Sequence, residues 1–275
     1  MKKMPDLLTR IGVGLVVFSI FLAAIFLGKE IGFMVIGGAG VLLGLNEFYN
    51  LVDKGGFKPQ RLTGYLLGLS LFVGNSLVTF YGMSEQILLF SLLCMFLILP
   101  IELYRNRPDP FTNIAHGFLG IIYVAVPLAL MVNIIHPSDE VGYQPMFFVG
   151  WLMLILSSDS GAYLAGSAFG KNKLFERISP KKSWEGAIGG LAMSMAFAVG
   201  FAQFLDFLTI YEWIGLSFVS VVAGIYGDLV ESLLKRNVGA KDSGSLLPGH
   251  GGILDRLDSV GLATPFAFVY LKLFL

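Results

Sequence analysis

The stretch IAHGFLGIIYVAVPLALMVNII, residues 114–135, contains no Asp, Glu, Lys or Arg. A bilayer core about 30 Å thick is crossed by about 20 mostly apolar helical residues, because no water is available there to satisfy exposed backbone groups. The stretch therefore predicts a transmembrane helix. Similar runs recur along the whole chain, so this reading decides the class of fold.

Nine such runs predict an all-α polytopic bundle of transmembrane helices. They cover approximately residues 11–27, 31–45, 62–83, 87–103, 114–135, 146–168, 186–208, 213–229 and 259–275. No linker separates a soluble domain, so we expect a single integral membrane domain over residues 1–275. Within it, residues 1–145 mainly pack in the membrane, and residues 146–275 carry the unusual polar groups.

Composition excludes several classes of protein. Of the 275 residues, 55% are hydrophobic and only 14% are charged, and the mean hydropathy is +0.75, far above the soluble range. The net charge is zero, so the chain has no overall electrostatic attraction for nucleic acid. The single cysteine, Cys94, lies in an apolar run and predicts neither a disulfide nor a thiolate metal site.

The basic residues predict the orientation in the membrane. With nine spans and a cytoplasmic amino terminus, all but Lys29 and Lys272 of the 19 Lys and Arg residues fall on the cytoplasmic side. Cytoplasmic loops carry the excess of positive charge in membrane proteins. We therefore expect the carboxyl terminus outside and the polar face of the second half in the cytoplasm.

A first polar segment, SSDSGAYLAG at residues 157–166, lies inside the sixth run. An ionised Asp near the centre of a membrane helix costs about 2.5–3.5 kcal/mol on insertion scales, so Asp159 should face a polar cavity or a cation. Asp159, Tyr163 and Gly166 share one helical face. The alternative is that Asp159 is protonated or paired with another helix.

A second segment, ISPKKSWEG at residues 178–186, precedes the seventh run. A helix amino terminus offers unpaired N–H groups and partial positive charge, and Lys181 and Lys182 add full charges, so phosphate is a natural ligand. Ser183 suits the N-cap position. The alternative is that the lysines only reflect the positive-inside rule.

A third segment lies at the cytoplasmic end of the eighth run. Asp228, Glu231, Ser232 and Lys235 are spaced three and four residues apart and share a helical face. Acidic groups beside a lysine can bind a cation and a phosphate. Taken one at a time, each could equally be a solvated charge that pairs with its neighbours.

The same segment continues as PGHGGILDRLDS, residues 248–259. Asp255 and Asp258 project together if the chain is helical from residue 253 onward. Gly251 and Gly252 let the backbone approach a ligand closely. Acidic pairs among Lys, Arg, Gly and Ser are what a metal-assisted phosphoryl or nucleotidyl transfer requires, because carboxylates hold Mg²⁺ and cationic side chains neutralise phosphate.

Residues 232–258, SLLKRNVGAKDSGSLLPGHGGILDRLD, closely resemble the signature of the phosphatidate cytidylyltransferase (CDP-diacylglycerol synthase) family. Residues 159–171 and 178–186 resemble that family in the same order. The resemblance implies transfer of the cytidylyl group of CTP to phosphatidic acid, with release of pyrophosphate, at the cytoplasmic surface of a bacterial inner membrane.

Under this resemblance we expect Asp228, Asp255 and Asp258 to hold Mg²⁺, with Asp159 or Glu231 as outer partners or as ligands of a second cation. Lys235 and Arg256 join the three aspartates as catalytic residues. The residues expected to bind substrate are Lys171, Ser179, Lys181, Lys182, Ser183, Ser232, Arg236, Lys241, His250, Gly251 and Gly252.

The expected partners are CTP, phosphatidic acid and the bilayer. Small-residue spacings, Gly40 with Gly44 and Gly186 with Gly190, permit close helix packing within one chain or in a homodimer. A related enzyme that activates another lipid or polyprenol phosphate is the nearest alternative. A CDP-alcohol phosphotransferase lacks support because its D-G-x-x-A-R pattern is absent, and a transporter would place its polar residues near the midplane with repeat symmetry.

Overall fold

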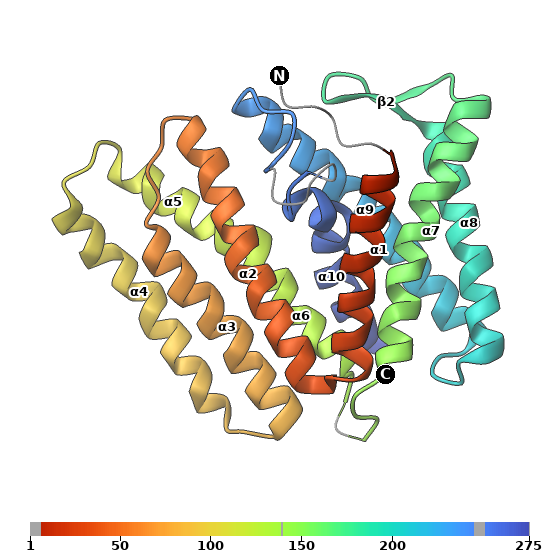
Figure 1. Cartoon of the computed structure of the whole chain (residues 1–275), viewed down its shortest axis with the longest axis horizontal. Helices are drawn as coiled ribbons and strands as arrows, with labels where there is room; N and C mark the ends of the chain where they lie inside the picture. The colour runs from red at the N-terminus through yellow and green to blue at the C-terminus, as the bar shows by residue number, and fades with distance from the viewer. Residues whose placement is uncertain (1–6, 139, 245–250, 275) are drawn as a thin grey trace. The chain divides into compact units, whose positions relative to one another are not determined.

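The computed structural model describes residues 7–138, 140–244 and 251–274, and these residues are mostly α-helical, as predicted (Figure 1). The elements, in chain order, are α1 (Leu7–Phe26), α2 (Lys29–Lys54), α3 (Arg61–Tyr81), η1 (Glu85–Ile87), α4 (Leu88–Arg105), α5 (Pro110–Gly120), η2 (Ile121–Ala125), α6 (Val126–Ile135), α7 (Pro145–Phe169), β1 (Lys173–Phe175), β2 (Ser179–Ser183), α8 (Trp184–Phe204), α9 (Ile210–Asn237) and α10 (Leu254–Phe274).

Among the described residues, eight helical segments are long and apolar enough to cross a membrane, and each overlaps one of the predicted runs. The remaining run, residues 11–27, overlaps α1, a helix of 20 residues that includes the apolar stretch Gly14–Phe26. The polytopic all-α class is therefore confirmed. The ninth span and the sides on which the termini lie stay predictions.

Several helices extend beyond the apolar runs that predicted them. Helix α2 continues to Lys54 rather than ending at residue 45, and α9 continues to Asn237 rather than to residue 229. The run that predicted α2 was too short because hydropathy falls from Asn46 onward while backbone hydrogen bonding continues. Helix α9 extends through the helical face predicted for Asp228 to Lys235. As a result Glu47, Asp228 and Glu231 all lie inside helices.

The fifth span is one continuous segment, Pro110–Ile135, interrupted by the five-residue π-helix η2. Pro127 follows two residues after η2 and has no backbone N–H to donate to the preceding turn. A π-helical turn is wider than an α-helical turn. Such turns commonly occur where a proline removes a hydrogen bond from the helix.

The chain forms two compact units. The first unit comprises Met1–Val132 and Asn237–Arg256, and the second comprises Asn133–Arg236 and Leu257–Leu275. The expected division at residue 145 was read from sequence alone and stays a prediction. The units do show that the signature segment is divided, with residues 237–256 belonging to the first unit.

The core of the first unit forms around α2, which packs against α1, α3, α5 and η2. Val41, Leu45 and Phe48 of α2 are buried there. Gly40 and Gly44 face the α5–α6 span: a Cβ at Gly44 would lie 2.7 Å from Val124 Cγ1, and one at Gly40 would lie 3.6 Å from Leu128 Cδ1. This small-residue pair therefore serves packing within the chain.

Helices α7 and α8 form the closest helix pair of the second unit and lie side by side in Figure 1. A Cβ at Gly190 would lie 2.6 Å from the Ser158 carbonyl oxygen, and one at Gly186 would lie 3.0 Å from that of Ala162. The predicted close approach at Gly186 and Gly190 is thus confirmed within one chain. A homodimer stays a prediction.

Helix α9 joins this pair through buried polar contacts and aromatic packing. Trp151 of α7 donates its indole N–H to Ser220 Oγ at 3.0 Å, and the hydroxyls of Ser194 on α8 and Ser217 lie 2.7 Å apart. The fully buried Trp213 of α9 packs against the rings of neighbouring helices. Hydrogen bonds between helices fix the register of α9.

A short antiparallel hairpin, β1 with β2, replaces the loop expected between the sixth and seventh runs. Lys173 pairs with Ser183 and Phe175 pairs with Ser179, with an irregularity between the two pairs. The hairpin ends directly at the start of α8 and so fixes where Lys181, Lys182 and Ser183 lie.

The close α7–α8 packing gives a first testable prediction. Gly190→Ala should destabilise the second unit by about 1–3 kcal/mol, because the added methyl would overlap backbone that cannot move away cheaply. The matched control is Gly200→Ala on the same helix, where a Cβ would meet nothing within 4 Å. Thermal unfolding in detergent measures both: the Gly190 variant should melt earlier than wild type and the Gly200 variant should not. Equal melting temperatures would contradict this packing.

Candidate functional site

Three carboxylates gather where α9 and α10 approach each other in the second unit. Asp228 and Glu231 lie on α9 and Asp258 lies on α10, and one oxygen of each lies within 4.8 Å of the others. The helices come this close because Gly227 has no side chain: a Cβ there would lie 2.3 Å from the Asp258 carbonyl oxygen. We call these three residues the acidic cluster.

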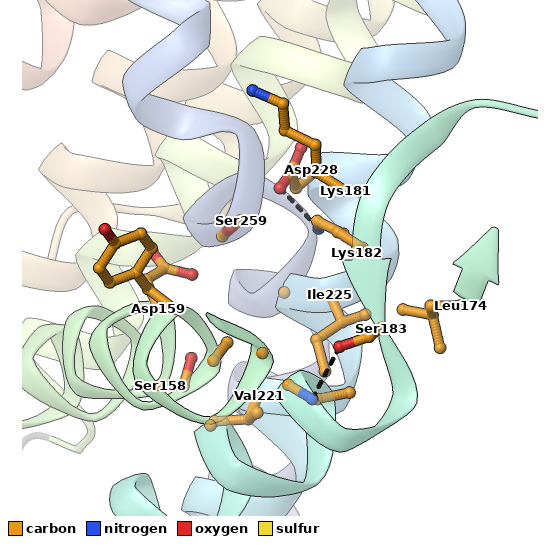
Figure 2. Close-up of a pocket in the computed structure, with 17 residues that line it drawn as sticks. Ser158, Asp159, Leu174, Lys181, Lys182, Ser183, Val221, Ile225, Asp228 and Ser259 are labelled. Carbon is orange, nitrogen blue, oxygen red and sulfur yellow. Dashed lines mark hydrogen bonds and ion pairs between the residues drawn. The ribbon is translucent and has the colours of Figure 1, made fainter. Parts of the chain in front are cut away.

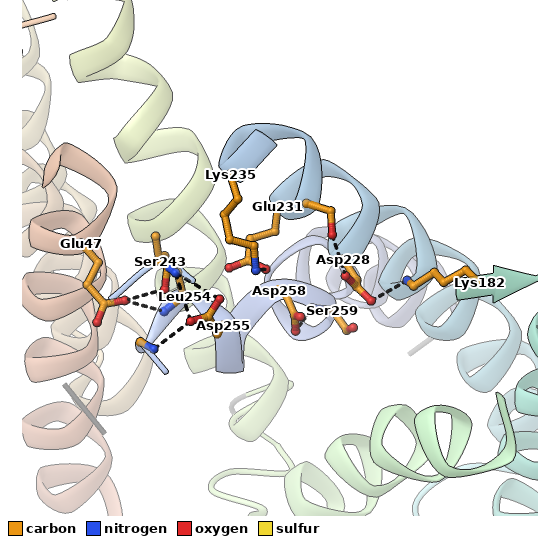
Figure 3. A network of polar contacts seen from close by, with 12 residues as sticks. Glu47, Lys182, Asp228, Glu231, Lys235, Ser243, Leu254, Asp255, Asp258 and Ser259 are labelled. Atoms are coloured by element: carbon orange, nitrogen blue, oxygen red, sulfur yellow. Dashed lines mark hydrogen bonds and ion pairs between the residues drawn. The ribbon is translucent and has the colours of Figure 1, made fainter. Parts of the chain in front are cut away.

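Hydrogen bonds and cations hold the acidic cluster in place (Figure 3). Ser232 Oγ donates to Asp228 Oδ1 at 3.3 Å, and the backbone N–H of Ser259 donates to Asp258 Oδ1 at 2.7 Å. Glu231 is fully buried, and its Oε2 lies 2.6 Å from Lys235 Nζ. The predicted shared face of α9 is confirmed, and within it the lysine neutralises the buried glutamate.

A cavity of about 240 Å³ opens beside Asp228 in the same unit (Figure 2). Asp159, Tyr163 and Gly166 of α7 line it together, as their shared helical face predicted. Asp159 therefore lies at a polar cavity, although it is not one of the three residues of the acidic cluster.

Lys182 connects the hairpin to the acidic cluster. Its Nζ lies 2.5 Å from Asp228 Oδ2, and both side chains remain partly exposed. Lys181 and Ser183 also line the cavity, so the hairpin supplies two cationic side chains and one hydroxyl. The cavity thus presents positive and negative groups together, an arrangement suited to a phosphorylated ligand with its counter-ion.

The amino terminus of α8 has the cap that the sequence predicted. Ser183 Oγ accepts the backbone N–H of Gly186 at 3.1 Å. Glu185, in the first turn, accepts the backbone N–H groups of Lys171 and Asn172. These contacts attach the turn after α7 to the start of α8 and orient the hairpin lysines.

In the first unit, Asp255 accepts several backbone hydrogen bonds, also drawn in Figure 3. Its Oδ2 accepts the backbone N–H groups of Gly252 at 2.8 Å and Ser243 at 3.1 Å, and its Oδ1 lies 3.3 Å from the same Ser243 nitrogen. Gly251 adopts φ +82°, and a Cβ there would lie 2.6 Å from Asp255 Oδ2. Helix α10 begins at Leu254, which confirms that Asp255 and Asp258 are helical.

The other predicted site residues lie as follows. Lys171, Arg236, Lys241 and Arg256 are exposed, and Ser179 is half-buried in β2. Gly252 is buried, with its backbone against Glu47 and Ser243. His250 lies outside the described residues. The substrate-binding and metal-binding roles of all these residues stay predictions.

Sequence reasoning missed Glu47 of α2. It is buried, with 6% of its surface exposed, and its Oε2 accepts hydrogen bonds from Ser243 Oγ and the Leu254 N–H, both at 3.0 Å. The available signal was an acidic residue among Leu45, Phe48 and other apolar residues. Glu47 was not predicted as a site residue because the second apolar run, residues 31–45, ends before it.

The acidic cluster fits a divalent cation. Mg²⁺ prefers oxygen ligands at about 2.0–2.1 Å, so oxygens around one ion lie up to about 4.2 Å apart. The observed limit of 4.8 Å needs only small side-chain rotations or a bridging water to reach that spacing. The donor set, three carboxylates and no thiolate or imidazole, is the chemistry of a hard cation.

The fold and site define a polytopic membrane protein with a carboxylate cluster and basic groups for phosphate chemistry. Residues 8–274 match the model of the cytidylyltransferase family, and the chain belongs to that family. It is 35% identical to a phosphatidate cytidylyltransferase of Bacillus subtilis over 98% of this chain and all of that protein. It is 32% identical to one of Haemophilus influenzae, over 96% of this chain and 98% of that protein.

Two further relatives carry the same name. A phosphatidate cytidylyltransferase of Staphylococcus aureus is 36% identical over 68% of this chain and 70% of its own length. A chloroplastic phosphatidate cytidylyltransferase of Arabidopsis thaliana is 29% identical over 96% of this chain and 70% of its own length. The family predicted from the signature segment is thus confirmed, and the match includes the first half of the chain.

Proposed function

We propose that this protein transfers the cytidylyl group of CTP to phosphatidic acid, giving CDP-diacylglycerol and pyrophosphate in phospholipid biosynthesis. The observation that carries the proposal is the full-length match to relatives named phosphatidate cytidylyltransferase. The acidic cluster beside a lysine-lined cavity supplies the groups that such a transfer requires.

The reaction joins two polyanions. An oxygen of the lipid phosphate forms a bond with the α-phosphorus of CTP, and the bond from that phosphorus to the bridging oxygen breaks, so that pyrophosphate leaves with the electron pair. Two like charges 4 Å apart repel by about 4 kcal/mol at an effective dielectric of 20. The ammonium groups of Lys181 and Lys182 at the cavity lower this repulsion and position the phosphates.

No protein nucleophile or general base is needed, because the attacking phosphate oxygen is already ionised near neutral pH. We assign Asp228, Glu231 and Asp258 as the groups that would hold Mg²⁺, with Asp159, which lines the cavity together with Asp228, as a partner for a second cation. The bound ion would supply charge neutralisation at the reacting phosphates. Lys235 orients Glu231 through its contact at 2.6 Å.

We propose that the protein lies in a bacterial cytoplasmic membrane with its site facing the cytoplasm. The support is the distribution of basic residues, which leaves only Lys29 and Lys272 on the opposite side in a nine-span arrangement. Labelling single cysteines introduced at exposed Lys173 and at Glu140 with a membrane-impermeant reagent tests this. Only the residue 140 variant should react in intact cells.

The direct test of function uses purified protein in detergent micelles with Mg²⁺, CTP labelled in its α-phosphate and phosphatidic acid. Label should move to the lipid phase, with one pyrophosphate released per lipid product. A polyprenol phosphate offered in place of phosphatidic acid tests the alternative acceptor. Transfer to the polyprenol phosphate alone, or no pyrophosphate with either lipid, would overturn the proposal.

The two hairpin lysines give a graded prediction. Lys182→Gln should raise the apparent KM for substrate about tenfold, because its ammonium is held at Asp228 beside the cavity. Lys181→Gln should have a smaller effect, since Lys181 is exposed. Lys173→Gln, on the other strand of the hairpin, is the control and should leave KM unchanged. Steady-state kinetics with each substrate in turn measures this, and unchanged KM values in both lysine variants would assign these residues to membrane topology alone.

A further inference from the structure

Glu47 is an acidic residue of a membrane-spanning helix that the proposed mechanism does not use. It lies on α2, and its carboxylate accepts hydrogen bonds from Ser243 and Leu254 of the same compact unit, about 200 positions further along the chain. Ionisable residues within membrane helices are costly and usually have a specific role. The question is what this carboxylate does for the distant segment.

The two oxygens of Glu47 have different surroundings. Oε2 accepts both hydrogen bonds, from Ser243 Oγ and from the Leu254 N–H. Oε1 is buried and has no hydrogen-bond partner among the described residues. A single acceptor oxygen therefore makes both contacts, and Figure 3 shows the two contacts converging on the Glu47 carboxylate from the same side.

Both partners lie within the signature segment, residues 232–258. Leu254 is the first residue of α10, and its N–H is one of those that a helix leaves without an internal partner. Glu47 satisfies this N–H with its Oε2 at 3.0 Å. Ser243 precedes α10 in the chain, and its backbone N–H donates to Asp255 Oδ2.

The glycines of the segment match this arrangement. A Cβ at Gly244 would lie 2.5 Å from Glu47 Oε1, and a Cβ at Gly252 would lie 2.2 Å from Oε2. Both positions therefore need glycine while Glu47 is in place. Sequence reasoning explained Gly252 by close approach to a ligand, and the structure shows close approach to a side chain of the protein itself.

We infer that Glu47 is a positioning residue that acts as a clamp: its Oε2 joins Ser243 to Leu254, the first residue of α10. This inference rests on the proposed function, because the segment adjoins the predicted catalytic residues Asp255 and Arg256. The clamp needs one acceptor oxygen and the right side-chain length, and it does not need the second oxygen.

The test compares Glu47→Gln with Glu47→Leu. Glutamine keeps one oxygen that can accept from both Ser243 and Leu254, whereas leucine keeps similar volume and leaves both donors without a partner. We expect Glu47→Gln to retain kcat within about fivefold of wild type, measured per folded protein. Glu47→Leu should lose at least about 50-fold in kcat, with a smaller change in the KM for CTP. Ser243→Ala, which removes one of the two bonds, should fall between them.

Glu102 provides the matched control. It is equally buried, at 3% exposed, in a membrane helix of the same unit, and its carboxylate contacts Gln60, Asn113 and Arg105. Glu102→Gln and Glu102→Leu should each change kcat per folded protein less than threefold, even where they lower the melting temperature.

Hydrogen exchange gives a readout that does not depend on activity. Peptides carrying Ser243 and Leu254 should exchange at least tenfold faster in Glu47→Leu than in wild type, and close to the wild-type rate in Glu47→Gln. Unchanged exchange in Glu47→Leu would overturn the clamp. Faster exchange with unchanged kcat would overturn its role in catalysis. Equal kcat losses in the Gln and Leu variants would show that a charged carboxylate is required, and would also overturn the clamp.

The exchange experiment separates this inference from the proposed function. If wild-type protein transfers no label from CTP to phosphatidic acid, the proposed function fails, yet the exchange rates still decide whether Glu47 holds the segment.

Discussion

Asp228→Asn is expected to lower kcat for CDP-diacylglycerol formation about 1,000-fold while the protein still folds and inserts. One oxygen of each carboxylate in the acidic cluster lies within 4.8 Å of the other two. Asp228 also contacts Lys182, whose Nζ lies 2.5 Å from its Oδ2. Asparagine removes the negative charge that would hold Mg²⁺, and metal-ion charge stabilisation is worth several kcal/mol. A loss of about 4 kcal/mol corresponds to three orders of magnitude in rate.

The control for Asp228→Asn is Asp206→Asn, an exposed aspartate of the same unit that lies outside the acidic cluster. It should keep wild-type kinetics. Binding of Mn²⁺, followed by electron paramagnetic resonance without any substrate, should weaken at least tenfold in the Asp228 variant and not in the Asp206 variant. Full activity of the Asp228 variant at ordinary Mg²⁺ would remove Asp228 from the metal site.

Asp255→Asn is expected to reduce kcat at least 100-fold. Besides its predicted role in metal binding, Asp255 accepts backbone hydrogen bonds that asparagine would lose in part. Both carboxylate oxygens face the Ser243 N–H, and Oδ2 also accepts from Gly252. In either orientation of an asparagine amide, its NH₂ group meets a backbone donor. Each lost bond to a charged acceptor is worth about 1.5–3 kcal/mol.

The matched control is Asp109→Asn, in the same unit, because Asp109 is exposed with φ +51° and asparagine tolerates that conformation. Hydrogen exchange separates the two roles of Asp255. Faster exchange of the Ser243 and Gly252 amides supports the role in holding the segment, whereas weaker Mn²⁺ binding with normal exchange would support metal ligation. Wild-type kcat together with wild-type exchange would exclude both.

The acidic cluster shows which features of a site can be predicted from local sequence. Asp228, Glu231, Ser232 and Lys235 could be placed on one face because helical spacing is a local property. The Ser183 cap was predicted for the same reason. The contact between Lys182 and Asp228 could not be predicted as a specific pair, since it depends on how a hairpin and α9 pack.

The lengths of the helices show a different limit. Apolar runs located each span, but they ended α2 at residue 45 and α9 at residue 229, short of the observed Lys54 and Asn237. Hydropathy reports where a helix can face lipid, and it does not report where backbone hydrogen bonding ends. Polar residues that face the protein interior, such as Glu47, are therefore assigned to loops by this method.

By itself the sequence determined the class of fold, the family and the residue types of the site. These follow from composition, helical periodicity and a contiguous signature, all of which are readable along the chain. Only the tertiary structure decided which carboxylates meet and which residue of the first half holds the signature segment. Contacts such as Glu47 with Leu254 join residues some 200 positions apart, and no local pattern encodes which distant helix supplies a partner.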